Sequence, residues 1–121
     1  MRKSTLFLPL ALVLLLAPAV ALAETWTNVP LVDVNCSAKV AADPDAHTRD
    51  CALQCAKSGY GIIVGDGKYL QLDAEGSKKA LALLKASDRK DHLRVTLSGS
   101  LAGETIQVAA IEMAPLAPAA K

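Results

Sequence analysis

The sequence predicts a small, mainly β domain with helices, an α+β fold, over residues 24–113 of a 121-residue chain. Five short segments combine β-branched, aromatic and other apolar residues with alternation or with flanking turn residues, as strands do. Two further segments carry the capping residues and the spacing of apolar side chains that are typical of helices. The chain is therefore expected to form one barrel-like or sheet-based domain.

The first 23 residues are expected to be a cleaved signal peptide. Met1-Arg2-Lys3 is basic, residues 6–16 are apolar, and Ala21-Leu22-Ala23 has the small-x-small pattern of a cleavage site. The apolar segment is interrupted by Pro9 and is shorter than the roughly 20 residues that cross a bilayer. We therefore expect a periplasmic or secreted protein with no transmembrane anchor after cleavage.

The composition of the mature chain gives no support for a nucleic-acid partner. Two of the 13 Lys and Arg lie in the leader and none of the 12 Asp and Glu does, which leaves a net charge of −1. Three aromatic residues remain, Trp26, Tyr60 and Tyr69. A neutral surface with few aromatic residues provides neither the basic patch nor the stacking platform that nucleic-acid binding uses.

The first predicted strand and the segment after it bring the cysteines into the fold. A strand is expected over residues 26–34, with Pro30 at an edge or a bulge. A helix is then expected to begin with Asp43 or Thr48 as its N-cap, to continue through Lys57 and to stop at Gly59.

Two hairpins complete the sheet. Residues 60–64 and 68–72 are joined by Gly65-Asp66-Gly67, which supplies the positive φ angles of a tight turn. A helix over residues 77–85 follows, with its lysines toward solvent. Residues 93–99 and 106–112 then alternate as strands around a turn at Gly103, and residues 114–121 form a flexible Ala/Pro tail.

If the cysteine-bearing helix is treated as an insertion between strands 1 and 2, the remaining order matches the five-stranded, partly open barrel called the OB-fold. The segments GDGKYLQLD and LRVTLSGSLAGETIQVAAIEM, together with Asp33-Val34-Asn35-Cys36, resemble small exported OB-fold-like bacterial periplasmic proteins of uncharacterised function. This resemblance implies the fold and the compartment, and it implies no activity.

The candidate site consists of Cys36, His47, Cys51 and Cys55. Residues four apart share one face of a helix, so Cys51 and Cys55 can present both sulfurs to one ion but make a poor disulfide with each other. His47 can join them only if the helix begins after it, as capping at Thr48 would allow, because eight helical residues span about 12 Å.

Three interpretations of this cluster remain open. Cys36 can form a structural disulfide with Cys51 or Cys55, worth roughly 3 kcal/mol for a loop of about 15 residues, and an oxidising compartment favours this. Alternatively, three thiolates and one imidazole form a soft site for Zn or Cu. A reactive thiol of a redox enzyme is the least favoured, because only His47 is available to activate it.

Two side chains near these motifs receive simpler interpretations. His92, beside Asp91, is expected to be an ordinary surface residue. Asp33 can either orient a ligand or cap the loop that follows it. We expect a domain that binds a soft metal or an unknown protein partner, or a purely structural domain of the envelope, rather than an enzyme.

Overall fold

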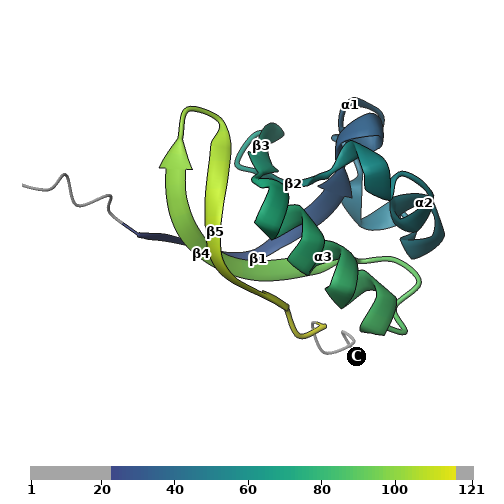
Figure 1. Cartoon of the computed structure of the whole chain (residues 1–121). Helices are drawn as coiled ribbons and strands as arrows, with labels where there is room; N and C mark the ends of the chain where they lie inside the picture. Colours follow the sequence, from purple (N-terminus) through teal and green to yellow (C-terminus); the bar gives the residue numbers. More distant parts are fainter. Residues whose placement is uncertain (1–22, 117–121) are drawn as a thin grey trace, which may run out of the picture.

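Five strands close into a mixed barrel in the order β1-β2-β3-β5-β4. The computed structural model describes residues 23–116 (Figure 1). The neighbouring strands are antiparallel except β3 and β5, which pair in parallel through Gln71 with Thr105 and Leu72 with Ile106. The strands are β1 (Glu24–Asp33), β2 (Tyr60–Val64), β3 (Lys68–Leu72), β4 (Arg94–Ala102) and β5 (Thr105–Met113). This order confirms the predicted OB-fold-like barrel.

The barrel interior is filled by the inward-facing residues of the alternating strands. In β4, Val95 and Leu97 are buried while Arg94, Thr96 and Ser98 are partly exposed, as the period of two requires. The buried cluster also includes side chains from the other four strands and from the helix between β3 and β4. Its members include Leu31, Tyr60, Ile62, Leu70, Leu72, Ala80, Leu84, Leu93 and Ile106.

The helix α3 (Ala74–Ala86) packs mainly against β5, with further contacts to β2 and β3 (Figure 1). It is longer than the predicted 77–85, because the carboxylate of Asp73 accepts a hydrogen bond from Gly76 N at 2.8 Å and caps an earlier first turn. Gly76 is required there, since a Cβ at this position would collide with the side chain of Val108.

The turns of both hairpins are as predicted. Gly65 and Gly67 have φ angles of 52° and 92°, and Gly103 has 63°, all in the left-handed region that glycine occupies without strain. The β4–β5 turn lies on the side of the barrel away from α1 (Ser37–Val40) and α2 (Arg49–Gln54) (Figure 1).

The insertion between β1 and β2 differs from the single helix that was expected through Lys57. It is divided into α1, α2 and three 3-10 turns at Val34–Cys36, Pro44–Ala46 and Ala56–Ser58. Contacts with the barrel explain this division: Asp45 is paired with Arg94 of β4, 49 residues away, and holds the middle turn against the sheet. A continuous helix could not follow this path.

The predicted signal peptide and the predicted Ala/Pro tail lie mostly outside the described residues. The signal peptide falls outside the described residues except for Ala23, and so do residues 117–121 of the tail. Ala114 is buried and its N–H donates to Arg94 O at 2.9 Å, so the ordered contacts continue one residue past β5.

Candidate metal centre

Asp33 occupies the junction between the barrel and the insertion. It is the last residue of β1 and is fully buried. Its Oδ2 accepts a hydrogen bond from Cys36 N at 3.0 Å and so caps the 3-10 turn at Val34–Cys36. Its Oδ1 accepts a second hydrogen bond, from His47 Nε2 at 2.7 Å. Both roles that the sequence left open, capping and orienting, are therefore filled by one carboxylate.

His47 reaches this carboxylate because α2 begins after it. Thr48 is the N-cap of α2, and its Oγ1 accepts a hydrogen bond from Cys51 N at 3.2 Å. His47 consequently lies in the loop, with only 5% of its surface exposed. A site that includes His47 requires the helix to begin after this residue, and α2 does begin after it.

Cys36 brings a sulfur donor to the same place. One donor atom from each of Asp33, Cys36 and His47 can be chosen so that all three lie within 4.8 Å of one another. Burial, followed by the charge and hydrogen bonding of Asp33, raises the pKa of the Cys36 thiol to about 11. At neutral pH Cys36 is therefore a protonated thiol beside a carboxylate.

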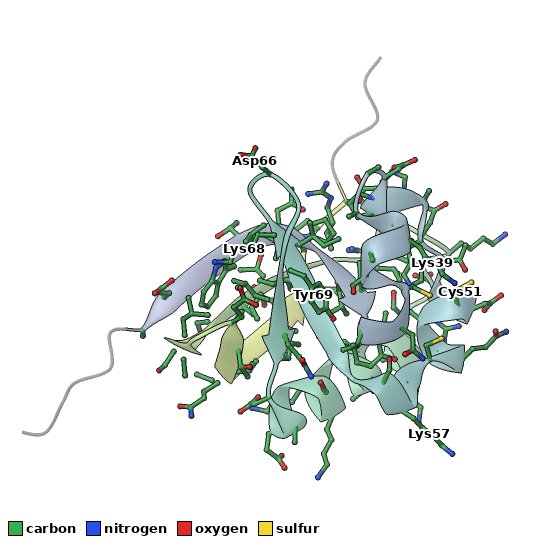
Figure 2. All side chains as sticks on the ribbon, turned by 90° about the horizontal axis from the view of Figure 1, so that it is seen from above. Lys39, Cys51, Lys57, Asp66, Lys68 and Tyr69 are labelled. Atoms are coloured by element: carbon green, nitrogen blue, oxygen red, sulfur yellow. The ribbon has the colours of Figure 1, made fainter. Side chains whose placement is uncertain are left out.

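The other two cysteines have different relations to this group. The Cys55 thiol is close enough to Cys36 to contribute to its raised pKa by hydrogen bonding and charge, and it is half-buried at the C-cap of α2. Cys51 lies one turn earlier and is exposed, on the same side of the molecule as Lys39 (Figure 2). Cys51 and His47 line a shallow pocket there of about 340 Å³.

The predicted set of four is thus only partly brought together. Cys36 and His47 converge, whereas Cys51 and Cys55 both lie outside the three-donor group, Cys55 beside Cys36 and Cys51 exposed. Asp33 was missed as a donor, although its position three residues before Cys36 is the spacing of an N-cap and its turn.

The predicted disulfide is not formed, and all three cysteines, which lie within the described residues, are free. Of the two partners proposed for Cys36, Cys55 adjoins it as a thiol, and Cys51 is exposed one turn earlier in α2. The structural interpretation based on a Cys36 disulfide is corrected accordingly.

The donor set of Asp33, Cys36 and His47 suits some ions better than others. Nitrogen, sulfur and oxygen donors together are the mixture that Zn²⁺ accepts, whereas a Cu⁺ site favours sulfur donors over a carboxylate. An ion here would displace the proton of the Cys36 thiol and neutralise the thiolate that forms beside the buried carboxylate of Asp33.

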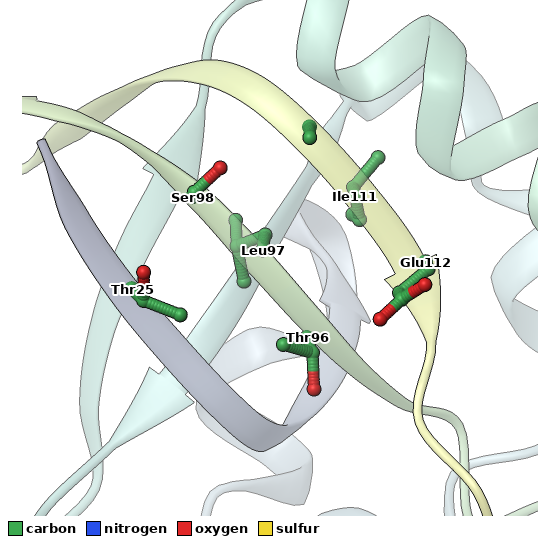
Figure 3. Close-up of a pocket in the computed structure, with 7 residues that line it drawn as sticks. Thr25, Thr96, Leu97, Ser98, Ile111 and Glu112 are labelled. Atoms are coloured by element: carbon green, nitrogen blue, oxygen red, sulfur yellow. The ribbon is translucent and has the colours of Figure 1, made fainter.

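A second hollow lies on the outer wall of the barrel, away from the cysteines. It measures about 370 Å³ and is lined by β1, β4 and β5, with the hydroxyl groups of Thr25, Thr96 and Ser98 and the carboxylate of Glu112 around it (Figure 3). Glu112 is the one titratable residue among those lining it, so this hollow gathers no set of ligands.

Comparison of the chain with protein-family models, curated proteins and solved structures finds no match. The fold and the site together therefore define the molecule in general terms, as an OB-fold-like barrel whose first connection carries an Asp, Cys and His group able to hold a metal ion. Among the residues that the structure describes, none of the helices has the length and apolar character needed to cross a membrane.

Proposed function

We propose that this protein is an exported metal-binding module that holds Zn²⁺ through Asp33, Cys36 and His47, with Cys55 as the fourth ligand. One observation carries the proposal: donor atoms of three different chemical types meet within 4.8 Å at a position where Asp33 is fully buried and His47 nearly so. Four ligands including sulfur and imidazole are the usual surroundings of a structural zinc ion.

Export rests on the pattern of the first 23 residues, with its basic start, apolar segment and Ala21-Leu22-Ala23. The periplasm and the outside of the cell are the compartments that such a leader addresses.

The ion would replace the hydrogen bond between His47 Nε2 and Asp33 Oδ1, because a ring nitrogen that carries a proton cannot ligate a metal, and it would fasten the insertion to the barrel. Asp33 and Cys36 come from the end of β1, His47 from the loop before α2, and Cys55 from the end of α2. A bound ion supplies folding free energy directly, because a site of this kind does not exist in the unfolded chain. The ion would thus stabilise the insertion as a Cys36 disulfide was expected to do.

A thiol enzyme is the weaker alternative. A nucleophilic cysteine needs a lowered pKa, which cationic neighbours or a helix N-terminus provide. The carboxylate of Asp33 next to Cys36 has the opposite effect and, after burial, is the next cause of the raised thiol pKa. The geometry of Asp33, Cys36 and His47 therefore suits ligation better than attack on a substrate.

The proposal is tested by titrating the reduced, metal-free protein with Zn²⁺ against a chromophoric chelator. We expect one ion per chain. Cys36→Ser should weaken the affinity by about 100-fold or more, since even the removal of a group that only orients a ligand costs 10- to 100-fold. Cys51→Ser is the matched control and should bind as the wild type does. A wild type that takes up no zinc, or equal losses in both variants, contradicts the proposal.

A further inference from the structure

A pocket of about 360 Å³ lies apart from the cysteines, between the β1 bulge, the start of β4 and the segment after β5. Its walls include Asn28, Arg89, His92 and Arg94. A volume above 300 Å³ is in the range of pockets that bind small molecules. Three unusual features of the described structure, in the backbone, in the charges and in the apolar surface, meet at this pocket.

The first feature is in the backbone. Among the residues that the structure describes, Asn28 and His92 are the two non-glycine residues with left-handed φ angles, 52° and 50°. Both line the pocket. Asn and His tolerate this conformation better than most residues, but it still has a cost that surrounding contacts must offset. Here Arg94 Nη1 donates to Asn28 O at 2.8 Å, and His92 N donates to Asp45 O at 3.0 Å.

The second feature is an unbalanced positive charge. Arg94 is neutralised by Asp45, which it contacts with two hydrogen bonds of 2.9 and 3.0 Å. Among the residues that the structure describes, Arg89 has no such carboxylate partner: its Nη2 donates to Ala114 O, and its Nη1, which is shielded from solvent, has no hydrogen-bond acceptor there. The charge of Arg89 is therefore not balanced by a described carboxylate, and an anion in the pocket would balance it.

His92, like Arg94, is paired with a carboxylate. Its Nδ1 lies 2.7 Å from Asp91 Oδ1, and that hydrogen bond raises the pKa of His92 above its ordinary value, assisted by the charges of Asp45 and Asp91 and opposed by that of Arg94. The carboxylate of Asp45 lies in the same wall and would repel a dianion. The balance of charge therefore suits a ligand with a single negative charge.

The third feature is apolar. Pro115 and Leu116 form one side of the pocket, and Leu116 is 59% exposed, against 38% for Leu101 at the far end of β4. A ligand with an apolar body would cover this surface and gain the free energy of its burial.

We propose that this pocket binds a small organic monocarboxylate, with the carboxylate group at Arg89 and the apolar body against Pro115 and Leu116. The site is independent of the metal centre, because it shares none of its ligands. Arg89 supplies the positive charge, and the apolar wall distinguishes such a ligand from an inorganic anion.

The test is a titration of the isotope-labelled protein, followed by its backbone amide NMR signals, with benzoate as the probe. We expect benzoate to shift the amides of His92 and Ala114 with a dissociation constant in the millimolar range or tighter. Benzamide, which has the same shape and no charge, should bind at least about tenfold more weakly, as expected for the loss of one charge-assisted hydrogen bond. Inorganic phosphate should also bind more weakly than benzoate.

Two variants separate the proposed site from general charge effects. Arg89→Gln should abolish the benzoate shifts, and Lys90→Gln, which removes an exposed neighbouring cation, should leave them unchanged. Equal weakening in both variants, or equal affinity for benzoate and benzamide, overturns the proposal. If Arg89→Gln fails to fold, the comparison of the three probes on the wild type still decides.

Discussion

Replacing Asp33 with Asn tests how far the junction between β1 and the insertion depends on a single carboxylate. Asp33 is fully buried and accepts two hydrogen bonds, from Cys36 N at 3.0 Å and from His47 Nε2 at 2.7 Å. Asn keeps one acceptor oxygen and turns its amide N–H groups toward the other donor. One hydrogen bond to a charged acceptor is thereby lost, which costs about 2 kcal/mol of the free energy of unfolding.

Metal adds a second, separable effect in the same variant. A ligand that binds the folded state at 100 times its dissociation constant stabilises it by about 2.7 kcal/mol. The free energy of unfolding of the wild type should rise by about 2.7 kcal/mol when Zn²⁺ is present at 100 times its dissociation constant. At the same zinc concentration Asp33→Asn should gain clearly less, because its carboxylate ligand is replaced by an amide.

Urea unfolding followed by circular dichroism measures both quantities, first with a chelator present and then with zinc. Asp66→Asn makes the same chemical change at the exposed tip of the β2–β3 turn, and it should change the stability little under either condition. An Asp33→Asn variant within about 0.5 kcal/mol of the wild type in chelator would refute the hydrogen-bond argument.

Three further outcomes follow from single contacts. Tyr60→Phe should lower the free energy of unfolding by about 1–2 kcal/mol, because the buried Tyr60 hydroxyl donates to Ala52 O at 2.7 Å and that carbonyl would lose its partner; urea unfolding that shows no change would contradict this. Hydrogen bonds from Arg94 lower the pKa of Asp45, so the pair stabilises the fold above the ordinary carboxyl pKa of about 3.9 and loses this effect as the pH falls. The deficit of Asp45→Asn relative to the wild type, measured by thermal unfolding, should accordingly be larger at pH 6 than at pH 3, and a deficit independent of pH would be inconsistent with it. Since the pKa of Cys36 is raised to about 11, zinc binding must displace its proton, and this proton alone makes the apparent affinity rise about tenfold per pH unit between pH 6 and 9. Release of the Cys55 proton adds to the slope, so the chelator competition assay should show a rise of at least about tenfold per unit, and a flat profile would exclude Cys36 as a ligand.

The barrel could be predicted from the sequence because its determinants are local. Alternation of apolar and polar residues defines β4 and β5, and the glycines at 65, 67 and 103 have the positive φ angles that their turns require. Once the strands and α3 are placed in order, few topologies remain, and the OB-fold-like order is among them.

The insertion could be predicted only in part, because contacts distant in sequence determine its path. Asp45 pairs with Arg94, and Arg49 Nε donates to Leu84 O at 2.7 Å, so the segments between them follow the barrel surface instead of forming one helix. Thr48 was identified as a possible cap from its residue type alone, and its side chain does cap α2.

The set of ligands at the site could likewise be predicted only in part. Sequence spacing favoured Cys51 because it lies four residues before Cys55, yet Cys51 is exposed and lies outside the three-donor group. The inclusion of Asp33 depends on its contact with His47, 14 residues later in the chain, which no local pattern encodes. Local periodicity identifies the elements that carry ligands, and tertiary packing selects which ligands meet.

Asp33, Cys36 and His47 are proposed as ligands of one zinc ion, with Cys55 as the fourth. X-ray absorption at the zinc edge on the stoichiometrically loaded, reduced protein tests this claim most directly. We expect two sulfur neighbours at about 2.3 Å and two nitrogen or oxygen neighbours at about 2.0 Å, with one sulfur lost in Cys36→Ser and none lost in Cys51→Ser. A shell of oxygen atoms alone, or a loss of sulfur in Cys51→Ser with none in Cys36→Ser, would contradict the claim.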